Sequence, residues 1–222
     1  ILIKLMSIVS LVIAPYIATT GTNEMKSEVV VSENTTVVSN VSKDIAKEMS
    51  GTYIMDDAHS FINFSIRHLL SQAKGNISID TGVVNIDATN LSASTMMFVM
   101  NANTITTQND YRDKHIKGVD FFATDSFPKI TFTASSIDTM PSNPIFRYVA
   151  RGILDMHGFK KEINLPFNYH GLTEIPEEKM MVHSFDGEML ISRMDFKIGE
   201  EGGSVGNDVK IEFWIEVYQQ KK

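Results

Sequence analysis

From Gly51 onward, apolar and polar side chains alternate with a period of two in one run after another. The clearest run lies near the C-terminus, and its apolar residues share one parity: Val209, Ile211, Phe213, Ile215 and Val217. The positions between them are Lys210, Glu212, Trp214 and Glu216. Because successive side chains of a strand point to opposite faces, this pattern predicts strands with one buried and one solvated face.

Similar runs occur earlier and are separated by turn signals such as KGN, DTG, PSNP and EEGGSVGND. Their apolar parity comprises Ile130, Phe132 and Ala134, then Phe146, Tyr148, Ala150, Leu154 and Met156, then Ile163, Leu165, Phe167 and Tyr169. The segment TQNDYRDKHIKG, with its charges and terminal glycine, predicts a short helix. Seven or eight antiparallel strands of this kind bury their apolar face in a sandwich or in a closed barrel, and periodicity alone does not separate the two.

The N-terminal region differs from the rest of the chain. Residues 1–21 have one lysine, then an apolar run, then small residues, which is the order of a secretory signal peptide whose start lies upstream of Ile1. The apolar run is short for a membrane span, although an uncleaved anchor helix is the alternative. Residues 22–50 are rich in Ser, Thr, Asn, Glu and Lys and predict a flexible polar spacer, with a short helix around 42–49. The domain proper is expected at 51–222.

The stretch HSFINFSIRHLL carries His59 and His68, nine positions apart. On one straight strand they lie roughly 30 Å apart and on opposite faces, so they cannot share a metal unless the chain turns sharply between them. His68 has the parity of Phe64 and Ile66, which makes it a polar group on the apolar face. His59 has the other parity and is expected to fasten a strand to an adjacent turn.

Composition narrows the function classes. The chain has 27 acidic and 20 basic residues, for a net charge of −7, which argues against a nucleic-acid ligand. It has no cysteine, which excludes disulfides, thiolate metal sites and Cys nucleophiles. No G-x-S-x-G elbow is present, and the glycine-rich GEEGGSVGND precedes a strand and lacks the P-loop lysine. We therefore expect neither a hydrolase nor a nucleotide-phosphate site.

A metal site is also not expected. None of the six histidines forms a close pair such as H-x-H or H-E-x-x-H. Strands distant in sequence could still bring His59, His115 and His157 together. The basic residues around Arg112 and His115 could hold an anionic headgroup, but a solvated helix face threaded with acidic residues is the simpler interpretation. Thirteen methionines, several of them in strand-like runs, suit a cavity that accepts a flexible chain, although ordinary core packing explains any single one equally well.

Several segments, in order, resemble the YceI-like family. They are YIMDDAHSFINFSIRHLL, RDKHIKGVDFFATDSFPKITFTA, RGILDMHGFKKEINLPF, ISRMDFKIG and VGNDVKIEFWIEV, which together extend over residues 51–219. The family's signature positions match Asp56, His59, Ser60, Phe64, His68, Arg112, His115, Phe121, Phe122, Pro128, Phe132, Gly152, Leu154, His157, Gly158, Arg193, Phe196 and Gly199. One departure is Asp57, which replaces the family's usual proline in a turn.

The resemblance implies an all-β, lipocalin-like antiparallel barrel of about eight strands with one or two short helices. It also implies a secreted or periplasmic bacterial protein that is not an enzyme and that encloses a polyisoprenoid, an isoprenoid quinone or a fatty-acid derivative. The expected lipid-binding residues are Phe64, Ile66, His68, Met97, Phe122, Phe132, Leu154, Met156, Met189 and Phe213. Arg112 and His115 are the candidates for the lipid headgroup, and no metal or other cofactor is expected.

Dimers are common in the family, so a homodimer is one candidate assembly. A transient contact with a membrane surface is a second candidate interaction. Nucleic acid is not expected as a partner. Two other functions remain open. An enzyme acting on a lipid-like substrate would need a His/Asp pair with perturbed pKa values deep in the cavity. An envelope interaction module would have an interior filled by its own side chains.

The N-terminal pattern gives the first testable prediction. We expect cleavage to follow a residue between Ala18 and Gly21, because the small residues that follow the apolar run suit signal peptidase. N-terminal sequencing of protein recovered from the exporting host checks this. A mature chain that still contains Lys4 would contradict it.

Overall fold

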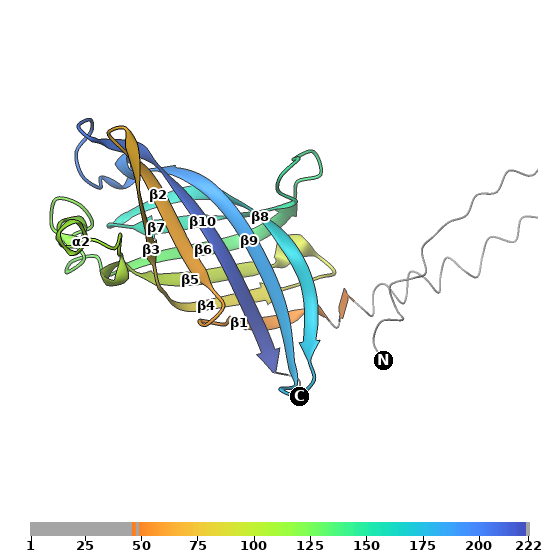
Figure 1. The fold of residues 1–222 in the computed structure, drawn as a ribbon. Coiled ribbons are helices and arrows are strands. Elements are labelled where there is room, and N and C mark those ends of the chain that lie inside the picture. Colours follow the sequence, from red (N-terminus) through yellow and green to blue (C-terminus); the bar gives the residue numbers. More distant parts are fainter. Residues whose placement is uncertain (1–45, 48, 221–222) are drawn as a thin grey trace, which may run out of the picture. The chain divides into compact units, whose positions relative to one another are not determined.

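The computed structural model describes residues 46–47 and 49–220 (Figure 1). The expected signal peptide and most of the expected spacer lie outside the described residues, although residues 46, 47 and 49 are helical. The strands are β1 (Gly51–Met55), β2 (Phe61–His68), β3 (Ser71–Ile77), β4 (Ile79–Ile86), β5 (Thr95–Asn101), β6 (Lys129–Thr139), β7 (Tyr148–Met156), β8 (Phe159–Ile175), β9 (Met180–Ser192) and β10 (Val205–Gln220). The helices are α2 (Asp110–Lys117) and three 3₁₀ turns, η1 (Leu91–Ala93), η2 (Ala102–Thr104) and η3 (Arg193–Phe196). Among the described helices, none has the length and apolar character that a membrane span requires.

Strand β10 closes the sheet because it pairs with three other strands. Along one edge it pairs with β9. Along the other edge it pairs with β2 between Val205 and Trp214, and with β1 at Val217 and Tyr218. Strands β1 and β2 are thus two halves of one bent strand, and β3 and β4, which pair with β2 and β1 respectively, are halves of the next. The result is a closed, eight-stranded antiparallel barrel, which confirms the predicted fold class and excludes the sandwich.

The bend between β1 and β2 is held against β10 by main-chain hydrogen bonds of Glu216. The Glu216 carbonyl accepts from the Asp56 amide at 2.9 Å and from the Ser60 hydroxyl at 3.2 Å. The Glu216 amide donates to the Ser60 hydroxyl oxygen at 3.0 Å. One serine side chain therefore satisfies both backbone groups of a β10 residue where the ladder passes from β1 to β2.

The predicted parity of the strands is confirmed. Phe132, Leu154, Phe213 and Ile215 are buried in the barrel interior, whereas Trp214 is 46 % exposed on the outer wall. The predicted helix within TQNDYRDKHIKG is α2. It begins after Asn109, whose side chain accepts a hydrogen bond from the Arg112 amide, and it ends at Gly118.

A polar cluster lies inside the barrel near the end where β1 pairs with β10. It consists of Tyr53, Tyr169 and His183, and we call it the floor. His183 is 1 % exposed, shares a 2.9 Å hydrogen bond through Nδ1 with the Tyr169 hydroxyl, and meets the Tyr53 ring edge-on. Its Nε2 atom has no hydrogen-bond partner among the described residues. Burial lowers the pKa of His183 to about 4, so this imidazole is neutral at physiological pH.

The floor makes the barrel sensitive to acid, which is the second prediction. Between pH 6.5 and 4 the unfolded chain binds a proton at His183 and the folded chain does not, so stability falls as pH falls through this window. The shift from 6.5 to about 4 corresponds to on the order of 3 kcal/mol of unfolding free energy. A His183→Gln variant keeps a hydrogen-bonding side chain for Tyr169 but does not titrate, so it should lose less stability on acidification.

Chemical denaturation of parent and variant at matched pH values measures this difference. Both proteins share every other titrating group, so the comparison isolates His183. Two curves of stability against pH that run parallel between pH 7 and pH 4 would contradict the assignment.

Candidate functional site

The barrel encloses a cavity of about 430 Å³ whose wall is almost entirely apolar. Side chains from strands β2 to β10 reach it, and α2 with the segment that follows covers one end. The expected lipid-binding residues on this wall are Phe64, Ile66, His68, Phe122, Phe132, Leu154, Met156, Met189 and Phe213. Both headgroup candidates, Arg112 and His115, also line it. The structure thus gathers eleven of the twelve expected residues around one space, although their contact with a lipid stays a prediction.

Met97 is the exception, and its assignment to the cavity was wrong. Met97 lies on the outer wall and is 40 % exposed, opposite Val83 and Thr133. Neighbouring residues on a strand face opposite sides, and Met96, Phe98 and Met100 take the inward positions of β5. Phe98 is one of the lining residues that sequence analysis missed, and its parity with Met96 and Met100 was the available signal.

Three phenylalanines of the wall lie over glycines on the neighbouring strand. Phe64 is directly opposite Gly75 in the β2–β3 register, and Phe213 is opposite Gly187 in the β9–β10 register. In both pairs, a Cβ added to the glycine would come within 2.5 Å of an atom of the ring. Phe98 and Gly82 repeat the arrangement between β4 and β5. The missing side chain lets each ring pack against the wall, which leaves space in the interior.

The cavity opens at the end that carries α2. Three of its lining residues are exposed, Tyr111, His115 and Ser204, and we call the opening between them the mouth. His68, at the end of β2, lines the cavity close by and pairs with Val205 at the start of β10. The position of His68 on the apolar face agrees with its predicted parity.

Arg112 is fixed at the mouth by the segment that precedes α2. Its Nε atom donates to the Thr107 hydroxyl at 2.7 Å and its Nη2 atom to the Thr107 carbonyl at 3.0 Å. Thr107 is in turn fixed by Asp113, whose carboxylate accepts from the Thr107 amide at 2.8 Å and from the Thr106 hydroxyl at 2.7 Å. Burial by itself would raise the pKa of Asp113, but the hydrogen bonds from Thr107 and Thr106 outweigh it and hold the pKa below its usual value.

These contacts correct the interpretation of α2 as a simple solvated face. Asp113 is 7 % exposed, and Arg112 and His115 line the cavity. Lys114, by contrast, is exposed to solvent and does not line the cavity. The cationic residues of α2 therefore divide between the cavity and the outside.

Arg193 holds the loop between η3 and β10 by hydrogen bonds to its backbone. Its guanidinium is 4 % exposed and donates to the backbone carbonyls of Gly206 at 2.8 Å, Ile198 at 2.6 Å and Glu200 at 2.6 Å. A planar group with several donors in fixed directions is well suited to holding an irregular loop by its carbonyls. The connection between η3 and β10, which contributes Ser204 to the mouth, is thereby tied to the barrel.

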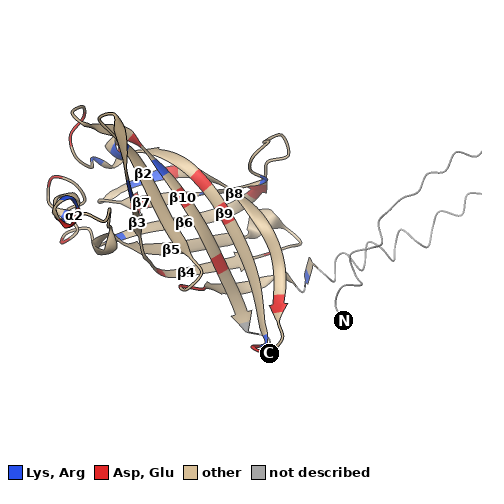
Figure 2. Ribbon diagram, in the orientation of Figure 1, with Lys and Arg blue, Asp and Glu red and all other residues tan. Residues whose placement is uncertain are grey.

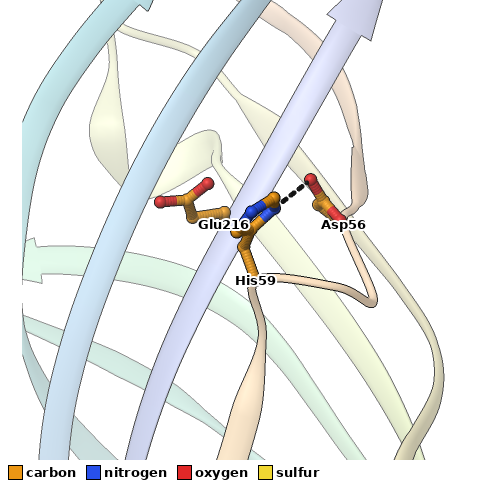
Figure 3. A group of neighbouring side chains, drawn as sticks. All are labelled: Asp56, His59 and Glu216. Carbon is orange, nitrogen blue, oxygen red and sulfur yellow. Dashed lines mark hydrogen bonds and ion pairs between the residues drawn. The ribbon is translucent and has the colours of Figure 1, made fainter.

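His59 lies outside the cavity, in the bend between β1 and β2 (Figure 3). Its Nδ1 atom donates to Asp56 Oδ2 at 2.8 Å, and Asp56 Oδ1 accepts from the Ala58 amide at 2.9 Å. The hydrogen bond with Asp56 raises the pKa of His59, and the same bond lowers the pKa of Asp56. This agrees with the prediction that His59 fastens a strand to a turn.

The side chains of Asp56, His59 and Glu216 approach one another closely enough to hold a cation, with ligand atoms within 4.8 Å. However, the facing atoms of Asp56 and His59 are already bonded to each other, and the group stands at the surface. The histidines that could have met do not do so. His115 is on α2, and His157 follows β7, where its Nδ1 atom donates to the Phe196 carbonyl at 2.9 Å. The His170–Asp186 pair is also on the outer wall, away from the cavity.

Comparison with known proteins identifies the family. The model of the YceI-like domain matches residues 53–217. A UPF0312 protein of Staphylococcus aureus (strain bovine RF122 / ET3-1) is 31 % identical over 167 residues, which are 72 % of this chain and 93 % of the relative. Among solved structures, BcnA of Burkholderia cenocepacia is similar with a TM-score of 0.62 and 18 % identity, over 73 % of this chain and 98 % of BcnA. A polyisoprenoid binding domain from Saccharophagus degradans has a TM-score of 0.58 and 18 % identity, over 76 % and 98 % of the two chains. This chain belongs to the YceI-like domain family.

Proposed function

We propose that this protein binds a long-chain apolar lipid inside its barrel, for storage, transport or protection of the cell envelope under stress. The observation that carries the proposal is the cavity of about 430 Å³ with an apolar wall. Its volume falls in the range of roughly 300–1,000 Å³ that is usual for small-molecule sites. Each CH₂ group moved from water to such a wall contributes about 0.8 kcal/mol, so a long chain needs few polar contacts.

The distribution of polar groups supports a lipid with one polar end. Arg112, His115 and His68 line the cavity at the mouth, and the buried Arg193 also lines it, whereas most of the remaining wall consists of Phe, Ile, Leu, Met and Val side chains. A guanidinium that is held in place by Thr107 can donate charge-assisted hydrogen bonds to a phosphate or carboxylate. Polyisoprenoids with a phosphorylated end, isoprenoid quinones and fatty-acid derivatives are the ligand classes that fit this arrangement.

Two further observations support the proposal. One structural neighbour is a polyisoprenoid binding domain, so the fold accommodates a ligand of this class. The alternative of an interaction module with a packed barrel requires an interior filled by side chains, and the cavity of this barrel is not filled. The signal-like order of residues 1–21 supports a location outside the cytoplasm, in the periplasm or secreted.

The third prediction tests occupation of the cavity. Phe132 is 5 % exposed and lines the wall, so Phe132→Asp places a carboxylate where hydrocarbon would lie. An unpaired charge there costs several kcal/mol or is neutralised by a raised pKa, and we expect the variant to lose its lipid. Mass spectrometry of an organic extract of protein from its native host measures the bound lipid, and circular dichroism reports the fold.

Thr133→Asp is the matched control, because Thr133 follows Phe132 on the same strand but is exposed on the outer wall. Met189→Asp places the same charge at a half-buried position of the wall, where the barrel tolerates it more easily. We expect lipid in the parent and in Thr133→Asp, and little in the other two. A folded Phe132→Asp protein with the parent's lipid content would show that the ligand does not occupy this face.

The fourth prediction concerns the polar end of the ligand. His68→Phe keeps the bulk of the side chain but removes its hydrogen-bonding atoms from the cavity wall near the mouth. The loss of one buried polar contact weakens binding by roughly 1–3 kcal/mol. Titration with a fluorescent fatty acid and with a fluorescent polyene that has no headgroup separates the two effects. Weakened binding of the acid alone is expected, and equal binding of both probes by parent and variant would remove His68 from the site.

A further inference from the structure

The turn between β2 and β3 departs from the usual chemistry of a hairpin. His68 pairs with Ser71, so the turn consists of two residues, Leu69 and Leu70. Leu69 has a φ of +51°, a region that L-residues with a side chain avoid. Turns of this length with a positive φ at the first position favour glycine there and a small polar residue next. Two leucines are therefore a poor choice for the stability of this hairpin.

The same two side chains are exposed to solvent. Leu69 is 60 % exposed and Leu70 is 106 % exposed relative to the reference state of its residue type. Neither contributes to the buried core of the barrel. The turn thus combines an unfavourable backbone conformation with apolar surface in water. Two leucines disfavour both this backbone conformation and exposure to water. Their presence here therefore indicates a function other than stabilising the fold.

The turn stands at the mouth of the cavity. His68, the residue before it, lines the cavity, and the Leu69 amide donates to the carbonyl of Ser204, which also lines it, at 2.7 Å. Tyr111 of α2 is 88 % exposed and lines the same cavity, so an aromatic side chain also stands at the opening. Val119, in the segment that follows α2, is 85 % exposed. Figure 1 shows this turn and α2 at the same end of the barrel.

We propose that the mouth end of the barrel docks on the surface of a lipid bilayer, with Leu69 and Leu70 inserted among the lipids and Tyr111 at the interface. The inference rests on the proposed function, because an apolar ligand that passes between a membrane and the cavity avoids water only if the mouth meets the membrane. The leucines and Tyr111 lie on separate segments around one opening. In a bilayer, aliphatic side chains can insert among the lipid tails while a Tyr side chain stays at the level of the headgroups.

The charges at this end indicate which kind of surface it meets. Basic and acidic residues both occur there, as Figure 2 shows, and on α2 Lys114 is close in sequence to Asp110. The chain as a whole has a net charge of −7. Attraction to anionic lipid therefore contributes little, and docking depends on the apolar side chains. Binding should persist on zwitterionic lipid and in salt.

The experiment uses vesicles of phosphatidylcholine and compares three proteins by flotation. The test variant is Leu69→Gly/Leu70→Asn, which supplies the residues that the turn favours and removes both apolar side chains. Its thermal stability should equal or exceed that of the parent, so a loss of docking cannot come from unfolding. The control is Ile145→Ser, in the connection between β6 and β7 at the other end of the barrel, where Ile145 is 66 % exposed.

We expect the parent and Ile145→Ser to float with the vesicles, and the turn variant to bind less by at least about a hundredfold, as follows from the loss of two inserted leucines. Added salt, or added phosphatidylglycerol, should change the parent's binding little. Equal flotation of all three proteins would overturn the inference, and so would a parent that does not float. A parent that forms dimers, which the turn variant abolishes, and that does not float would assign the turn to a second copy instead.

Organic extraction of the same samples separates this inference from the proposed function. Lipid in the cavity of a parent that does not float would leave the function standing and remove the docking surface. Flotation of a parent that never carries lipid would keep the docking surface and contradict the function.

Discussion

The barrel depends on main-chain pairing along β10, the strand at which the sheet meets itself. Its far edge accepts β2 over one stretch and β1 over another, with the bend between them held by Ser60 and the backbone of Glu216. Closure removes free strand edges, and it also forces one parity of every strand into a common interior. The character of that interior then follows from the side chains that fill it.

The size of the inward side chains leaves this interior hollow. Phenylalanines pack over glycines at Phe64–Gly75, Phe98–Gly82 and Phe213–Gly187, so the rings line the wall. A β-branched residue in place of each glycine would push the ring inward and fill part of the space. The cavity thus depends on pairs of phenylalanine and glycine on neighbouring strands. These pairs explain why large aromatic residues and an open interior occur together.

The sequence predicted the strands and their inward faces because the alternation of apolar and polar residues is a local pattern. In a β-strand, alternate side chains point to opposite faces of the sheet, so the pattern directly indicates which residues point inward. The error at Met97 arose where two adjacent methionines compete for the inward position. The parity that Met96 shares with Phe98 and Met100 was the local signal, and the pairing of Phe98 with the buried Phe132 agrees with it. The floor was not predictable. His183 of β9 meets Tyr169 of β8 through the register of two strands, next to an irregularity at which Tyr169 opposes Phe185 and Gly171 opposes Ser184, and the sequence does not show that register. The bend that brings Glu216 to His59 is equally non-local, as is the burial of Asp113 under Thr106 and Thr107.

The two ends of the interior differ in electrostatics, and this difference gives an amphipathic ligand a direction. At the floor, His183 is buried, and because burial lowers its pKa to about 4 it has no charge at neutral pH. At the mouth, the guanidinium of Arg112 is always charged and is fixed by Thr107, with His115 beside it on the cavity wall. Away from the mouth, a charged headgroup would lose its hydration against an apolar wall without gaining a counter-charge, whereas at the mouth it would keep both water and a cation. An apolar tail has the opposite preference. An amphipathic lipid bound as we propose would therefore lie with its tail inside and its polar end at the rim, where the exposed leucines of the β2–β3 turn also lie.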